Sequence, residues 1–215
     1  MSSEPLTWPE KGDLLFTAGD DWWHNACLNY VPDDWGLYVI GYKMAADALV
    51  EKVKETHRNQ DVLVFPIVFL YRQYLELRLK QLIRLGSELL DEALDFPKGH
   101  KLDTLWNSCR PIFVKLESRT SQQDLEAITE AIDQFCAIDP TSEAFRYPIT
   151  RKGDKTIPSD VRHINLRQLL EIMEKVANFF DSVATMFSVW MDHKHDMERE
   201  LRDNYGGFSS TIVPI

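Results

Sequence analysis

The chain has 215 residues, 44% of them hydrophobic, which is typical of one packed globular domain and excludes a largely disordered chain. Its formal net charge of −10 at pH 7 argues against a surface that coats nucleic acid broadly, because such binding needs clustered lysine and arginine. A small basic pocket remains compatible with this charge. The sequence has no run of about 18 apolar residues, so it predicts no membrane span.

Residues 1–33 are expected to form an irregular arm, because prolines and glycines interrupt them repeatedly. The arm holds three of the six tryptophans, Trp8, Trp22 and Trp23. Exposing these rings would leave a large apolar area in water, so we expect the arm to pack on the helical body or on a second subunit.

The first helix is predicted over residues 35–57. Its apolar residues recur mostly at three- and four-residue steps, which is typical of the buried face of a helix. The predicted face consists of Leu37, Ile40, Met44, Ala48 and Val53.

The second helix is predicted to open at Pro66, a residue suited to a first turn, and to stop at Gly86. "SELLDEAL" then continues as a short helix. A third helix begins near His100, and Pro111 should kink or end it.

The fourth helix is expected to start after Ser121, which can cap it, and to run to about Ile138. In residues 139–164, "FRYPIT" and "KTIP" flank "RKGD", and this pattern predicts a short β-hairpin.

The last helix is predicted from Asn165 to about Leu201. At roughly 1.5 Å per residue it overhangs a compact bundle, so we expect its end or the arm to meet another chain. Its apolar residues follow a heptad pattern over about three repeats. This heptad seam consists of Leu169, Met173, Val176, Phe180, Val183, Phe187 and Trp190.

The predicted fold is therefore all-α, a bundle of about five helices with a small β-hairpin insert before the long last helix. The predicted divisions are the aromatic arm (1–33), the helical bundle (34–203) and a C-terminal tail (204–215).

A row of charged residues lies along the predicted second helix. Arg72, Glu76 and Lys80 are spaced four apart and so share one line of the helix. The neighbouring residues are apolar nearly all round, which predicts that the row is partly buried and must be paired. It can be an interhelical latch, a binding or catalytic site, or a solvated stripe. We expect Glu76 to pair with Arg146 or Lys80, near His100.

Three short motifs occur in order along the chain. Phe69 precedes Glu76 in the second helix, and Lys80 follows Glu76 by four residues. "GHKL" at 99–102 begins the next helix, and "RYP" at 146–148 leads towards the last one. The last two motifs also have a structural interpretation. The histidine of "GHKL" lies at a helix start, where it can bond backbone, and "RYP" can serve hairpin packing.

Together these motifs resemble the HEPN domain, and their order and approximate distances agree over residues 37–190. The resemblance implies a helical bundle, frequent dimerisation, and membership in RNase, toxin–antitoxin or phage-defence systems. Active members use an R-x4–6-H motif in which the Arg and His of two subunits meet to cleave RNA without metal. Here no arginine is followed by a histidine at that spacing; after Arg146 and Arg151 the next is His163.

We expect no metal and no cofactor. The three cysteines are widely spaced, which indicates free thiols in a reducing cytoplasm rather than a disulfide framework or a zinc site. His193 and His195 point in different directions on a helix, so their geometry is poor for a metal, and a solvated helix end is the favoured interpretation.

Three functions fit the sequence. The first is a non-catalytic HEPN-like binding or regulatory protein, in which Arg72, Glu76, Lys80, His100, Arg146 and Tyr147 contact RNA, a nucleotide or a partner protein. The second is a ribonuclease with a displaced active site, where His100, Glu76 and Arg146 converge for acid–base chemistry. The third is a structural subunit of a larger complex. We also expect a homodimer or a partner protein, and leave open whether the chain is an enzyme.

Overall fold

The computed structural model describes residues 8–28, 35–94, 96–117 and 121–205. The chain divides into two units, residues 1–34 and residues 35–215. In the described part of the first unit, a short 3-10 helix, η1 (Trp22–His24), begins after Asp21, whose carboxylate accepts the Trp23 N–H. Its tryptophans, Trp8 included, are largely exposed.

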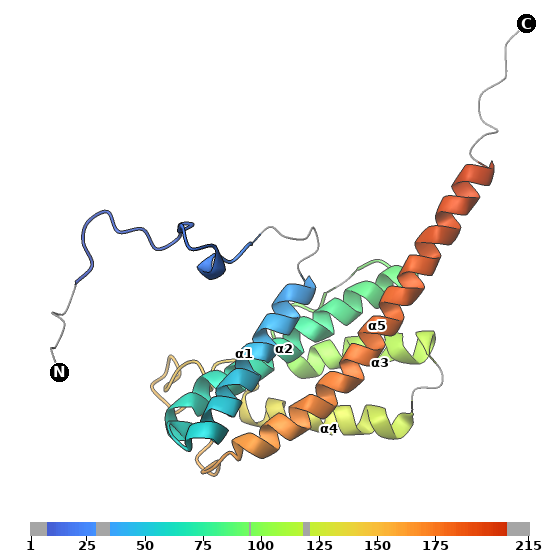
Figure 1. Cartoon of the computed structure of the whole chain (residues 1–215). Coiled ribbons are helices and arrows are strands. Elements are labelled where there is room, and N and C mark those ends of the chain that lie inside the picture. Colours follow the sequence, from blue (N-terminus) through green and yellow to red (C-terminus); the bar gives the residue numbers. More distant parts are fainter. Residues whose placement is uncertain (1–7, 29–34, 95, 118–120, 206–215) are drawn as a thin grey trace, which may run out of the picture. The chain divides into compact units, whose positions relative to one another are not determined.

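The second unit is a bundle of α-helices, which confirms the predicted all-α class (Figure 1). Its described helices are α1 (Trp35–Thr56), α2 (Gln60–Leu89), α3 (Leu102–Leu116), α4 (Gln122–Ile138) and α5 (Leu166–Tyr205). The central helix is α2, which packs against α1, α3 and α5, while α4 packs on α3. None of the described helices is both long and apolar enough to cross a membrane.

The predicted β-hairpin is wrong. Between α4 and α5 the described chain forms turns, with one isolated antiparallel bridge between Ile149 and Lys155. The Thr150 N–H donates to the Asp154 carbonyl at 2.7 Å and closes the turn. Beyond the bridge the Thr156 N–H still donates to the Pro148 carbonyl at 3.4 Å, but Pro148 has no N–H with which to return the bond, so no ladder forms.

The buried face of α1 differs from the predicted one. Val39, Ala46 and Val50 are buried, whereas Leu37, Ile40 and Met44 from the predicted face are exposed. Ala48 is exposed as well, and Val53 is half-buried. This helix is apolar on more than one side, so its periodicity allows two faces, and packing against α2 selects one of them.

Both predicted ends of α2 are wrong. The helix begins at Gln60, so that Pro66 lies in its second turn, and it continues past Gly86 to Leu89. The extra first turn is held by packing, since Leu63 and Val64 lie against the core. Gly86 is a contact point and not a stop, because a Cβ there would lie 2.2 Å from Cγ2 of Ile112.

The other helices agree better with the prediction. α3 contains Pro111 without ending at it. α4 is capped by Ser121, whose hydroxyl accepts the N–H of Asp124, and it ends at Ile138 as predicted. α5 begins one residue after Asn165, whose side chain accepts the N–H of Gln168.

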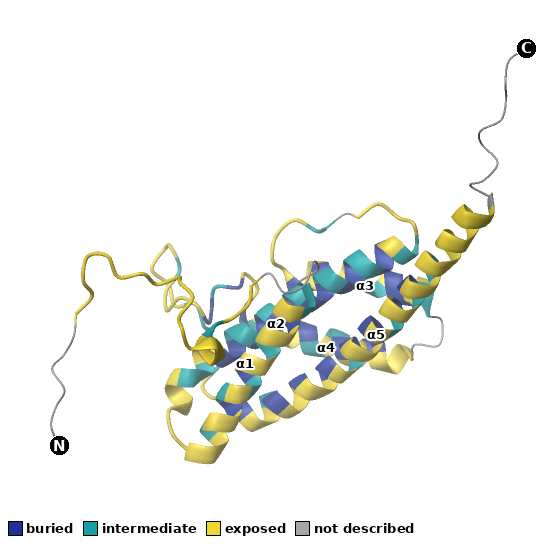
Figure 2. Cartoon of the chain, turned by 45° about the horizontal axis from the view of Figure 1, so that its top comes forward, coloured by how far each residue is buried: buried dark blue, intermediate teal, exposed yellow. Residues whose placement is uncertain are grey.

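The heptad seam of α5 is covered by the chain's own bundle. Five of its residues are buried, and Leu169 and Trp190 are half-buried (Figure 2). The ring of Phe180 lies 6.1 Å from Trp106 of α3, and the ring of Phe187 lies 5.8 Å from Phe113. Burial of the seam therefore requires no second chain. Beyond the seam, α5 projects past the other helices as a largely exposed segment (Figure 1).

The predicted C-terminal tail, residues 204–215, lies outside the described residues except for its first two positions, which belong to α5.

Candidate functional site

The charged row of α2 is a paired and mostly buried cluster. Arg72 is 1% exposed and Glu76 is 2% exposed, so the row is not a solvated stripe. Glu76 Oε1 accepts a hydrogen bond from Lys80 Nζ at 2.8 Å and lies 2.6 Å from His100 Nδ1. Glu76 Oε2 lies 3.4 Å from Arg72 Nη1. The expected pairing of Glu76 with Lys80, beside His100, is confirmed.

Arg72 connects three segments of the bundle. Its Nη2 donates to the carbonyl of His100 at 2.7 Å, just before α3 begins. Its Nε lies 3.4 Å from both the carbonyl and Oδ2 of Asp139, which follows α4. Asp139 Oδ1 in turn accepts the N–H groups of Glu143 and Ala144. The row therefore acts as a latch that ties α2 to the start of α3 and to the segment after α4.

Glu76 is held in its ionised form. Burial raises the pKa of Glu76, but hydrogen bonds from Lys80 and His100 outweigh burial, and its pKa lies below the usual glutamate value. The charge on Glu76 thus balances the cations that surround it inside the bundle.

His100 is the member of the cluster that faces solvent, since its side chain is 68% exposed. A neutral His100 that donates its Nδ1–H to Glu76 carries its lone pair on Nε2. The buried carboxylate thereby orients an exposed imidazole, an arrangement that can bind an anion when protonated or exchange a proton with a ligand.

Arg146 and Tyr147 lie apart from Glu76. The guanidinium carbon of Arg146 sits 5.7 Å from the centre of the Phe69 ring and 5.5 Å from that of Tyr147. Its Nε donates to the carbonyl of Ser142. The alternative expectation, a pair between Glu76 and Arg146, is not what the structure shows, because aromatic rings and a backbone carbonyl hold this arginine.

The two exposed groups nevertheless lie over the same face of α2. Arg146 lies over Phe69, and His100 lies over Glu76. Phe69 and Glu76 are seven residues apart in α2, which is close to two helical turns and about 10 Å along the axis. Arg146 and Tyr147 are both exposed. We call the surface formed by His100, Arg146 and Tyr147 the α2 face.

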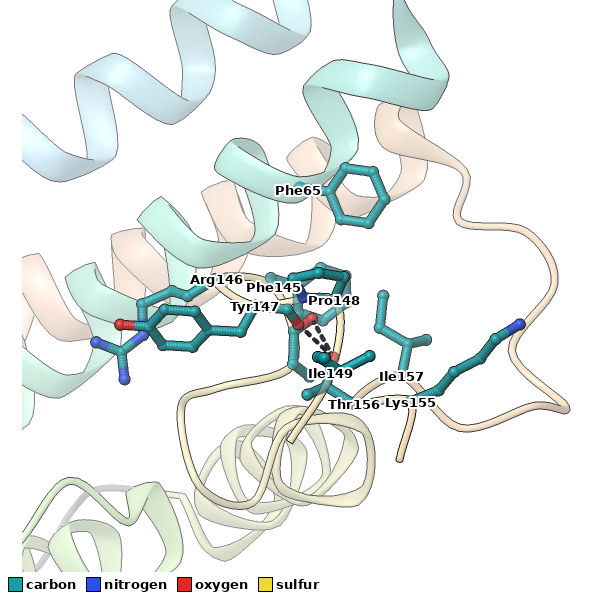
Figure 3. Close-up of a pocket in the computed structure, with 10 residues that line it drawn as sticks. Phe65, Phe145, Arg146, Tyr147, Pro148, Ile149, Lys155, Thr156 and Ile157 are labelled. Carbon is teal, nitrogen blue, oxygen red and sulfur yellow. Dashed lines mark hydrogen bonds between the residues drawn. The ribbon is translucent and has the colours of Figure 1, made fainter. Parts of the chain in front are cut away.

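A largely apolar cavity of about 500 Å³ adjoins the α2 face. It lies between Phe65 of α2 and the turns before α5, and in Figure 3 Arg146 and Tyr147 extend to the side opposite Ile157 and Lys155. Hydrogen bonds from Thr156 Oγ1 to the carbonyls of Ala144 and Tyr147 hold these turns together. The cavity is large enough for a small planar group.

No metal site is apparent in the described part of the chain, which has no group of three or more His, Cys, Asp or Glu side chains arranged around a common point. His193 and His195 are exposed on the projecting end of α5, and His195 Nε2 lies 3.7 Å from Glu88 of α2.

Sequence reasoning missed Asp139, whose carboxylate both receives Arg72 and caps the following turn. The only local signal for it is "DPTS", a turn-forming pattern in which an aspartate side chain often bonds backbone N–H groups two to four residues on. That pattern carries no information about Arg72, which lies 67 residues earlier.

The chain matches no protein-family model, no curated protein and no solved structure.

Proposed function

We propose that this chain is a HEPN-like cytoplasmic protein that binds single-stranded RNA or a nucleotide on the α2 face without cleaving it. In that role it would be a regulatory component of an RNA-processing, toxin–antitoxin or phage-defence system. The observation that supports this most is the placement of exposed His100 and Arg146 over one face of α2, above Glu76 and Phe69, two residues about 10 Å apart along the helix axis.

Each group on the α2 face suits a different part of a nucleotide. Arg146 and a protonated His100 can contact phosphates, which position a strand. The exposed ring of Tyr147 can stack on a base. Because the contacts with Glu76, Phe69 and Ser142 hold these side chains in place, little conformational entropy is lost when a ligand binds.

The proposal can be tested by fluorescence anisotropy with a labelled single-stranded RNA at fixed salt. We expect Tyr147→Ala to weaken binding by about 5- to 150-fold, since stacking contributes ~1–3 kcal/mol per base. Arg146→Ala should also weaken it. The matched control is Arg167→Ala, which removes the same charge from an exposed arginine of α5. Equal affinities for all three variants and the parent would contradict the proposal.

One observation favours the rival function, a ribonuclease with a displaced site. The pair of buried Glu76 and exposed His100 resembles the carboxylate–histidine arrangements that serve in acid–base catalysis. Denaturing gels of the same RNA mixtures distinguish the two functions. Cleavage that disappears in His100→Ala, in a protein whose circular dichroism is unchanged, would establish the ribonuclease instead of the non-cleaving binder.

A further inference from the structure

The cavity that adjoins the α2 face is bordered by large apolar side chains that remain in contact with water. Phe65 of α2 and Tyr147 and Ile149 of the turns before α5 are between 43% and 56% exposed, whereas Ala144 and Phe145, which also line the cavity, are at most 6% exposed. Exposed apolar residues gathered around a hollow commonly mark a binding site. The volume of about 500 Å³ lies within the range of small-molecule sites.

The lining of this cavity suits a hydrocarbon group. Apart from Tyr147, only Thr156 brings a hydroxyl group to it, and that hydroxyl is already bonded to the carbonyls of Ala144 and Tyr147. The N–H of Thr156 donates to the Pro148 carbonyl. A nucleobase inside the cavity would leave several of its edge donors and acceptors without partners, and each of these would cost free energy. An alkyl chain has no such groups to satisfy.

The charges of the lining are opposite in sign to that of the whole chain. The charged side chains that line the cavity are those of Arg146 and Lys155, and no aspartate or glutamate is among the lining residues, although the chain carries a net charge of −10. The Lys155 side chain has no ion pair or hydrogen bond with any described residue. In Figure 3 its stem extends outward along one side of the cavity, which leaves the ammonium free to meet an anion at the mouth.

The surroundings favour one negative charge on the ligand over two. Asp154 and Glu143 are direct sequence neighbours of the lining residues Lys155 and Ala144. Together with the acidic balance of the chain, these carboxylates repel a dianion such as a phosphate monoester more strongly than a monocarboxylate.

We infer that this cavity binds a fatty acid of medium chain length. The alkyl chain occupies the space between Phe65 and the turns before α5, and the carboxylate stays at the mouth, where it pairs with Lys155. Neither Lys155 nor Ile149 takes part in the RNA binding proposed for the α2 face, so the inference does not depend on that proposal.

The inference is tested by isothermal titration calorimetry of the full chain, without RNA, using straight-chain fatty acids from hexanoate to dodecanoate, each below its critical micelle concentration. We expect the affinity to rise about fourfold for each added methylene until the cavity is filled, because each buried methylene contributes a similar gain. Decylamine, which has the same chain length as decanoate and the opposite charge, should bind more weakly than decanoate.

Variants then locate the binding. Ile149→Glu places a carboxylate at the apolar border and should weaken decanoate binding at least tenfold. Its matched control is Val114→Glu, an equally exposed apolar residue of α3 outside the cavity, which should bind like the parent.

A second variant tests the charge. Lys155→Gln should weaken decanoate binding about two- to fivefold, the typical effect of an exposed ion pair. Lys152→Gln removes the same charge from the same turn but outside the lining, and should leave the affinity unchanged. If circular dichroism shows that Ile149→Glu does not fold, the two lysine variants decide the matter.

Three results would overturn the inference: an affinity that does not rise with chain length, decylamine that binds as tightly as decanoate, or cavity variants that bind decanoate like their controls. The anisotropy measurements with RNA report separately on the α2 face, so failure of one proposal is distinguishable from failure of the other.

Discussion

At the scale of single residues, Glu76 is the centre of the latch. Its two carboxylate oxygens meet Arg72, Lys80 and His100, and two of these partners come from its own helix one turn away on either side. Placing a charge in a protein interior costs several kcal/mol unless other charges and donors compensate it. The arrangement is stable only as a set, because each member offsets the desolvation of the others.

Replacing Glu76 by alanine should therefore destabilise the protein by about 3–5 kcal/mol, the usual cost of leaving one member of a buried ion pair without its partner. The strongly buried Arg72 would lose one of its anionic partners. Urea denaturation followed by circular dichroism measures the change. A loss below about 1 kcal/mol, the worth of an exposed pair, would show that the row contributes no more than a surface ion pair.

The pH dependence provides a control for this prediction. Because the pKa of Glu76 is lowered in the folded state, its stabilising effect is present above the unfolded value of about 4.5 and is lost as the pH falls through the folded value. The stability difference between the parent and Glu76→Gln should thus narrow in acid below that pH. A difference that stays constant from neutral pH to strong acid would contradict a paired, ionised Glu76.

At the scale of helices, α2 organises the bundle through its close contacts with α3 and α5. Side chains of both helices lie close to Gly86, since a Cβ there would lie 2.2 Å from Ile112 Cγ2 and 3.2 Å from Phe187 Cε2. Ile112 is β-branched and buried, so its methyl group has little freedom to move aside.

We expect Gly86→Ala to destabilise the protein by roughly 1–3 kcal/mol, the usual cost of overpacking a core, even though alanine favours helix formation. Gly41→Ala in α1 is the matched control, because nothing lies within 4 Å of the added Cβ. That substitution should stabilise by up to about 1 kcal/mol. Thermal or urea denaturation of both variants measures the difference, and equal effects of the two substitutions would contradict the close contact.

At the scale of the whole molecule, the bundle buries its own core, but apolar surface remains exposed elsewhere. Val189, Met197 and Leu201 are exposed along one side of α5 near its projecting end. Their spacing of eight and four residues places them on one stripe. Trp22 and Trp23 of the first unit are exposed as well. Exposed apolar stripes of this kind commonly mark contacts between proteins.

We therefore expect the protein to be a homodimer, with a mass by light scattering at low micromolar concentration of twice the monomer's 25.0 kDa. Met197→Glu and Leu201→Glu should shift the mass to that of the monomer while leaving the fold intact, because both side chains are exposed in the single chain. A mass of 25.0 kDa that does not change on concentration would instead point to a different protein as the partner of this stripe.

The pattern of apolar residues alone predicted the all-α class and the positions of most helices, since helix formation depends largely on neighbours three and four residues away. The cap at Ser121 and the start of α5 after Asn165 are local features of this kind and were predicted correctly. The burial of Arg72 and Glu76 was also predictable, because the residues around them are apolar on nearly every side.

Other features depended on contacts between segments that are distant in sequence. The sequence around Asp139 resembles that of other turn aspartates, and only the fold places Arg72 beside it. The sequence around Gly86 likewise does not mark it as a contact point, because the contacting side chains belong to α3 and α5. The buried face of α1 was decided in the same way, by the surface that α2 presents to it. Periodicity specifies which residues share a face, but only packing determines which face is covered, because burial is a property of the neighbouring elements.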